Sequence, residues 1–357
     1  MTTRRSSPSD QRAQLAKQRR EVDFDTLDVT VDELLRRTSR KRIDIAPSYQ
    51  RQFVWDDVRQ SRLIESVFLG IPVPPLFMAT NTYEYRGTQW EVVDGLQRLM
   101  TLLNFAGDSD GRNVAHLEEK PLVLKDLEKL HTFEGCSFED LPEDLRTGFE
   151  DRPLKVVVLN DKSELQVRYD LFERLNTGGV VLTPHQIREC VYRGDFIDLL
   201  TSLANDSCFR KVVVLPKTRW KDGTPQDLIL RFFSFLEGYV NFDHSVKDFL
   251  NDFTKCAHES PQVDRRREVF QETFTFLADC FPSGLKTRKG QTPINLFEAV
   301  SVGAAMALQA AGRKVKSVIN PSWVFSDELR RLTTGATNSR PRVRGRIEYS
   351  RDRFLEA

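Results

Sequence analysis

Five consecutive residues near position 95 combine groups that phosphate chemistry uses. Asp94, Gly95, Leu96, Gln97 and Arg98 follow a β-rich run and lead into an amphipathic helix. A glycine at a helix N-terminus lets phosphate approach unpaired backbone N–H groups, and the helix dipole adds positive potential there. Arg98 could pair with two phosphate oxygens, Asp94 could hold Mg²⁺ or polarise a water molecule, and Gln97 could orient that water. The segment therefore predicts a phosphate site, with Asp94, Gln97 and Arg98 as candidate catalytic residues. A plain strand–turn–helix corner, with Arg98 in a salt bridge, explains the same residues.

Two further segments carry groups suited to a nucleotide. One places an aromatic ring, an amide and a guanidinium in consecutive positions, at Tyr49, Gln50 and Arg51. These groups could stack on a base, recognise its edge and neutralise phosphate, or they could cover an edge of the core. The other segment could form an anion-binding nest of backbone N–H groups, or could simply end a helix. It consists of Asn176, Thr177 and Gly178.

Alternating arginines near the C-terminus are candidates for contacts with DNA phosphates. They are Arg340, Arg342, Arg344 and Arg346. If they line one face, they could neutralise several phosphates. A polar tail facing solvent explains them as well.

The composition excludes several classes of protein. The 53 basic and 52 acidic residues nearly cancel, so whole-chain charge argues neither for nor against nucleic acid. The five cysteines include no C-x-x-C pair, which argues against a disulfide framework or zinc knuckle and favours a reducing cytoplasm. No segment approaches the about 18 consecutive apolar residues of a membrane span, so we expect no membrane association. The chain also lacks a P-loop motif and an H-E-x-x-H pair, which excludes a P-loop NTPase and a zincin.

The expected fold class is α+β, with a mixed α/β domain followed by an α-helical domain. We expect a disordered basic arm at 1–23, the mixed domain at 24–185 and the helical domain at 186–357. Capping signals at Thr30 and Thr183 and a stop at Gly70 predict helix ends. The stretch 107–150 has weak periodicity and suggests an insertion. The apolar run Leu154–Leu159 predicts a strand buried on both faces.

Four motifs in order resemble one known family, the N-terminal domain of GmrSD-type modification-dependent restriction endonucleases, a branch of the ParB/sulfiredoxin-like fold. The matching stretches are Tyr49–Trp55, Leu63–Pro75, Glu91–Leu102 and Phe172–Arg188. The resemblance implies nucleoside triphosphate (NTP) binding and hydrolysis at a D-G-Q-Q-R motif, coupled to control of DNA cleavage. Asp94, Gly95, Gln97 and Arg98 match that motif, whereas Leu96 replaces a glutamine. The family's His-Asn-His nuclease domain has no candidate here, so DNA cutting would need a separate subunit or a site that the sequence does not reveal.

Three functions remain open from the sequence. The first is an NTP-binding regulator, with or without hydrolysis, in a restriction or anti-phage system. It would act with DNA, with a separate nuclease or other defence subunit, or as a homo-oligomer. The second is a DNA-binding module without turnover. The third is a nuclease with a metal at Asp94, which is disfavoured because one carboxylate rarely suffices for metal-dependent phosphodiester cleavage.

Overall fold

The computed structural model describes residues 7–18, 23–45, 53, 55–83, 87–117, 120–160, 169–171, 173–174, 183–243, 245–287, 290–311, 315–335 and 337–356. The chain divides into two compact units, Met1–Val181 and Leu182–Ala357, which we call the mixed unit and the helical unit. The mixed unit contains helices and a sheet and the helical unit contains helices, which confirms the α+β fold class followed by a helical region. The expected boundary between positions 185 and 186 falls inside helix α9 (Pro184–Val191).

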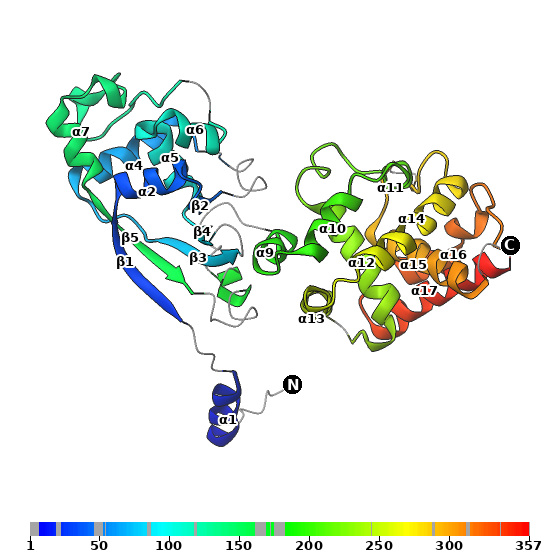
Figure 1. Cartoon of the computed structure of the whole chain (residues 1–357). Helices are drawn as coiled ribbons and strands as arrows, with labels where there is room; N and C mark the ends of the chain where they lie inside the picture. The colour runs from blue at the N-terminus through cyan, green and yellow to red at the C-terminus, as the bar shows by residue number, and fades with distance from the viewer. Residues whose placement is uncertain are drawn as a thin grey trace. The chain divides into compact units, whose positions relative to one another are not determined.

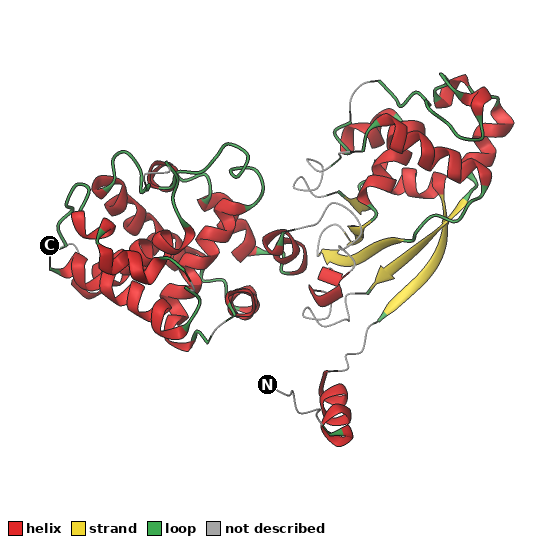
Figure 2. Ribbon diagram, turned by 180° about the vertical axis from the view of Figure 1, so that it is seen from behind, coloured by secondary structure: helices red, strands yellow, loops and turns green. Residues whose placement is uncertain are grey.

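The mixed unit consists of a sheet and a layer of helices. Its strands are β1 (Phe24–Thr30), β2 (Ile43–Asp44), β3 (Leu76–Tyr83), β4 (Gly87–Asp94) and β5 (Pro153–Leu159). Its helices are α1 (Pro8–Gln18), α2 (Val31–Ser39), α4 (Asp57–Leu69), α5 (Leu96–Ala106), α6 (Ser109–Val114), η1 (His131–Phe133), η2 (Phe138–Asp140) and α7 (Glu143–Glu150). Figure 1 shows α2, α4, α5 and α6 gathered on one face of the sheet, and Figure 2 shows the same layer from behind.

The five strands lie in the order β1-β5-β3-β4-β2. Strand β3 runs antiparallel to β4 and parallel to β5, while β2 runs parallel to β4 and β1 antiparallel to β5. Along β5, Leu154, Val156 and Val158 are buried, while Lys155 between them is exposed and pairs with Asp28 of β1. The expectation that β5 is buried on both faces is therefore corrected for its first part, where exposed and buried residues alternate, while Val158 and Leu159 at its end are both buried.

Local capping chemistry sets several helix ends as the sequence predicts. Thr30 accepts from the Glu33 backbone N–H at 3.2 Å, so α2 begins there. Gly70 ends α4 with a left-handed φ of 70°, which glycine adopts without strain. At α9, Thr183 accepts from the Gln186 N–H at 3.3 Å, and the Gln186 side chain accepts from the Thr183 N–H at 2.8 Å.

Two parts of the mixed unit differ from the sequence expectations. Where composition predicts a disordered arm, Pro8–Gln18 forms the exposed helix α1, whose start is capped by reciprocal bonds between Ser7 and Asp10. The stretch 107–150 is part of the core rather than an insertion. Its apolar residues Leu122, Leu124 and Phe149 are buried in the same cluster as the strands and α5.

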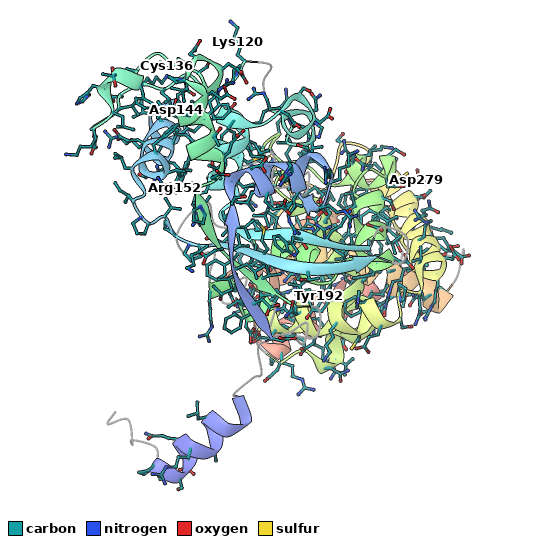
Figure 3. All side chains as sticks on the ribbon, turned by 60° about the vertical axis from the view of Figure 1, so that its left-hand side comes forward. Lys120, Cys136, Asp144, Arg152, Tyr192 and Asp279 are labelled. Carbon is teal, nitrogen blue, oxygen red and sulfur yellow. The ribbon has the colours of Figure 1, made fainter. Side chains whose placement is uncertain are left out.

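Glu65 of α4 fastens that stretch to the rest of the unit. Its carboxylate is 6% exposed and accepts from the backbone N–H groups of Glu128, Lys129 and Leu130 at 3.1, 2.6 and 2.8 Å. Just beyond the stretch, Arg152, labelled in Figure 3, also contacts α4 by donating to the Phe68 carbonyl at 3.2 Å. The stretch therefore contributes to stability through tertiary contacts that a sequence pattern does not reveal.

The helical unit is built from helices that pack around the apolar helix α15. They are α9 (Pro184–Val191), α10 (Asp195–Leu203), α11 (Ser207–Val212), α12 (Thr224–Gly238), η3 (Tyr239–Asn241), α13 (Val246–Glu259), α14 (Val263–Cys280), α15 (Ile294–Ala311), η5 (Ser322–Phe325), α16 (Asp327–Thr333) and α17 (Arg340–Leu355). Among the described residues α15 alone is long and apolar enough to cross a membrane, and 61% of it is buried inside the protein. It packs against α12, α14 and α17, as expected for the central helix of a globular core.

Candidate functional site

The predicted phosphate corner lies where β4 passes into α5. Met78 of β3 pairs with Val92 and Phe77 pairs with Asp94, so Val93 is an extra residue that bulges out of β4. A bulge of this kind turns the strand end and re-aims the side chains beside it. Gly95 follows with φ 95°, and a Cβ there would lie 2.4 Å from Leu76 Cδ2. Gly95 is thus required by backbone conformation and by close packing, whether or not a phosphate binds.

Arg98 is held by three protein groups. Its Nη2 donates to Asp94 Oδ2 at 2.7 Å, and its Nη1 donates to the carbonyls of Pro74 and Pro75, the latter at 2.9 Å. The Arg98 side chain is only 13% exposed. Burial lowers the pKa of Arg98, and the nearby Asp94 carboxylate partly offsets this effect. In this arrangement Arg98 joins β4, α5 and the loop before β3. Its guanidinium is directed at these protein groups and not at a free space where a phosphate could bind.

Asp94 is the more accessible member of that pair. Its side chain is 26% exposed, and its Oδ2 accepts from Arg98. No bond to Oδ1 occurs within the ranges that the structure describes. One carboxylate oxygen is thus fixed in position by Arg98 while the other can accept a hydrogen bond or a cation.

Gln97 and Leu96 face the protein rather than the corner. Gln97 is 9% exposed, and its Oε1 accepts from the Trp55 backbone N–H at 3.2 Å. Trp55 in turn accepts from Gln60 of α4 at 2.9 Å, so Gln97 anchors the chain that enters α4. Leu96 is half-buried against the hydrophobic core. Leucine at position 96 is therefore accommodated by apolar packing.

The N-terminus of α5 is left without a side-chain cap. Gly95 is its N-cap residue and makes no side-chain hydrogen bond, whereas Thr30, Asp56 and Thr183 cap α2, α4 and α9. The first backbone N–H groups of any helix lack partners within the helix. Those at the start of α5 therefore lie beside Asp94 without the carboxylate or hydroxyl that caps these other helices.

The other predicted nucleotide contacts lie outside the described residues. They are Tyr49, Gln50 and Arg51, and Asn176, Thr177 and Gly178. The last described residues before the first group are those of β2 and Ile45. Asp44 at the end of β2 pairs with Glu91, and β2 and β4 run parallel, so the chain leaves β2 at the edge where β4 ends in Asp94.

The C-terminal arginines form part of a helix and not of a polar tail. In α17, Arg340 donates to the Val240 carbonyl at 3.0 Å, Arg342 to the Thr334 carbonyl at 3.0 Å, and Arg344 to Glu348 at 2.8 Å. Arg346 is 0% exposed and donates to Glu298 and to the Thr337 carbonyl. Arg346 is accordingly removed from the expected DNA contacts. Residues two apart on a helix point to different sides, so the alternation does not place the four arginines on one face.

Sequence reasoning missed a chain of buried charges in the helical unit. Arg188 donates to Asp227 at 2.7 Å, Arg231 bridges Asp227 and Glu298 at 2.8 Å each, and Arg346 completes the chain at Glu298. Burial raises the pKa of Asp227, but the guanidinium groups of Arg231 and Arg188 outweigh it and hold that pKa below its usual range. The available signal was Glu298, a single acid in the otherwise uncharged sequence of α15.

The described residues offer few groups for metal ligation or thiol chemistry. No group of three or more histidine, cysteine, aspartate or glutamate side chains there could hold a metal ion. Cys136, Cys208, Cys256 and Cys280 are free thiols. At the corner, Asp94 is the carboxylate with an oxygen left open.

By architecture, the chain is a mixed α/β unit, in which the interior strand β4 leads into a helix without a side-chain cap, followed by a helical unit. Residues 31–193 match the model of the GmrSD restriction endonuclease N-terminal domain. This part of the chain, from the start of α2 to just beyond α9, belongs to that family. The match indicates a protein of a restriction or defence system. No curated protein matches the chain.

Proposed function

We propose that this protein is an NTP-binding and NTP-hydrolysing regulator of a restriction system, with the ParB/sulfiredoxin-like fold that the family resemblance implies. The observation that carries the proposal is the uncapped start of α5 beside Asp94, in a domain of the GmrSD N-terminal family. A triphosphate is an anion suited to first-turn N–H groups and to the positive end of the helix dipole.

In this proposal the residues of the corner have different roles. The phosphate accepts hydrogen bonds from the backbone N–H groups that open α5. Arg98 is a positioning residue, because it fixes Asp94 Oδ2 and the loop at Pro74 and Pro75. Asp94 Oδ1 fits Mg²⁺ only as a single protein ligand, which suits an ion whose other ligands are phosphate oxygens and water. The ion would neutralise charge on the phosphates, and Gln97 would act through its bond to Trp55.

The regulator is proposed to act on DNA in one of two ways. It binds DNA itself, or it controls a separate nuclease that cuts DNA. Arg340 and Arg344 are exposed on α17 and remain candidate phosphate contacts. If they bind DNA, charge removal at both positions lowers the salt dependence of binding in a mobility-shift assay, by a slope of about 1 per contact. An unchanged slope removes α17 from the DNA interface.

The nucleotide proposal is tested by calorimetric titration of the full chain with each NTP, with and without Mg²⁺. Asp94→Asn is expected to weaken binding about tenfold when Mg²⁺ is present, because it removes a charged ligand, and to weaken it little without Mg²⁺. Asp57→Asn is the control, since Asp57 is an exposed acid in the first turn of α4, paired with Lys125. Equal affinities for wild type and Asp94→Asn in Mg²⁺ would contradict the role given to Asp94.

A further inference from the structure

A pocket of about 260 Å³ in the helical unit is lined by the N-termini of four helices. The first residues of α9, α12, α13 and α15 all line it, at Pro184, Thr224, Val246 and Ile294. The N-terminus of each helix carries a partial positive charge, so four helix dipoles direct positive potential into one small volume.

Side-chain charges add to that potential. Arg188, Arg219, Arg231 and Lys247 line the pocket against Asp222 and Asp227, a balance of four cations and two anions, or +2. Including Glu298 and Arg346, which continue the chain of ion pairs behind the wall, adds one charge of each sign and leaves +2. Arg219 is exposed, and its guanidinium makes no hydrogen bond or ion pair with other described residues.

His185 supplies a second and independent sign of a ligand. It lines the pocket, is 4% exposed, and its Nδ1 is buried with no hydrogen-bond partner in the described part of the chain. Burial lowers the pKa of His185 to about 4. The carboxylates of Asp227 and Asp222 oppose this shift and the guanidinium of Arg188 adds to it, so the ring is neutral at physiological pH. A neutral imidazole still has one N–H to donate, and a buried polar atom without a partner is rare in native proteins.

We propose that this pocket binds a phosphate dianion, as the terminal phosphate of a small phosphorylated molecule or as inorganic phosphate. The +2 balance matches a phosphomonoester, which carries two negative charges, better than the single charge of a phosphodiester in DNA. The pocket volume of about 260 Å³ accommodates a phosphate group. Arg219 and Lys247 are the groups at the mouth, and the pair of Arg188 with Asp227 is the fixed wall behind them.

The site is separate from the corner at Asp94, so it extends the proposed function and does not depend on it. A ligand there would contact the first turns of α9, α12 and α13 together and would stabilise their arrangement. Helix α9 lies at the end of the stretch that matches the GmrSD family, and the other helices follow it in the chain. Binding of a phosphorylated metabolite in the pocket would therefore stabilise this end of the family domain.

The test is calorimetric titration of the full chain with inorganic phosphate in a buffer free of other phosphates. Saturable binding is expected for the wild type, and Arg219→Gln is expected to weaken it about tenfold through loss of a charge-assisted hydrogen bond. Lys221→Gln is the matched control, because Lys221 is exposed in the same loop but does not line the pocket. Lys247→Gln repeats the test from α13.

Further arms separate the possible outcomes. Asp94→Asn is expected to leave phosphate binding unchanged, which distinguishes this pocket from the nucleotide corner. Competition by AMP identifies a phosphomonoester group as the source, and its failure with retained phosphate binding identifies the free ion. The proposal is overturned if the wild type shows no saturable phosphate binding. It is also overturned if Arg219→Gln and Lys221→Gln behave alike, or if duplex DNA displaces the bound phosphate.

Discussion

Replacement of Glu298 by glutamine tests the buried charge chain that supports the helical unit. Glu298 is 1% exposed and accepts from Arg231 at 2.8 Å and from Arg346 on its second oxygen. Glutamine keeps the shape but removes the charge, which leaves the fully buried Arg346 without a carboxylate. Each charged hydrogen bond contributes about 1.5–3 kcal/mol. Breaking a buried pair by removing one partner costs about 3–5 kcal/mol, so we expect a loss in that range.

The assay is thermal unfolding of the full chain by calorimetry. For a unit of this size, about 1 kcal/mol moves the midpoint by about 2–4 °C, so the transition that includes α15 and α17 should fall by roughly 10 °C. Glu356→Gln is the control, because Glu356 pairs with Arg353 in solvent and should leave the midpoint within error. Adding Arg346→Met to Glu298→Gln should recover part of the loss, since the orphaned cation is removed. A Glu298→Gln midpoint no lower than that of the control would refute the reasoning.

Three further predictions concern the mixed unit. Gly95→Ala should lower the free energy of unfolding by more than about 1 kcal/mol, because of the φ of 95° and the 2.4 Å approach to Leu76 Cδ2. This loss should be smaller in a chain that also carries Leu76→Ala, and equal losses in urea unfolding would contradict the clash. Burial raises the pKa of Glu65, but three backbone N–H donors lower it below the ordinary 4.5, so its stabilisation is present above that pH and is lost as pH falls through the lower folded pKa. Urea midpoints should therefore drop more steeply below about pH 4.5 in the wild type than in Glu65→Gln, and parallel pH profiles would disprove this. Leu96→Gln should leave NTP affinity within about twofold while lowering stability, because Leu96 packs on the core, and a larger change in calorimetric affinity would place residue 96 in the site.

Features that depend on neighbouring residues could be predicted from the sequence. The capping box at Thr183 and the left-handed stop at Gly70 follow from side chains within a few positions, and both are confirmed. The β4–Gly95–α5 corner also follows from local signals, since a β-rich run, a glycine and an amphipathic helix occur in order.

Features that depend on distant partners could not be predicted. Strand β1 has five exposed residues at its start and gains its place by pairing with β5, more than a hundred positions away. The stretch 107–150 lacks periodicity because its few apolar residues pack individually into a core formed by other elements. The alternation of the arginines predicts a DNA contact for Arg346, because alternate residues of an extended chain lie on one face. In the helix this rule does not hold, and Arg346 points toward Glu298.

The candidate site shows the same division. The sequence predicted that Asp94, Gly95 and Arg98 share one corner, and the structure brings them together. It did not predict that the carbonyls of Pro74 and Pro75 engage Arg98, or that the Trp55 backbone engages Gln97, because both contacts depend on loops returning to the corner. Tertiary contacts therefore decide which of these side chains remain available for a ligand.

The central claim is tested most directly by the position of the triphosphate in a crystal structure of the full chain with a non-hydrolysable NTP and Mg²⁺. The account predicts phosphate oxygens within hydrogen-bonding distance of the first backbone N–H groups of α5, with Arg98 still bonded to Asp94 Oδ2. A nucleotide bound elsewhere, with the start of α5 facing only water, would contradict it.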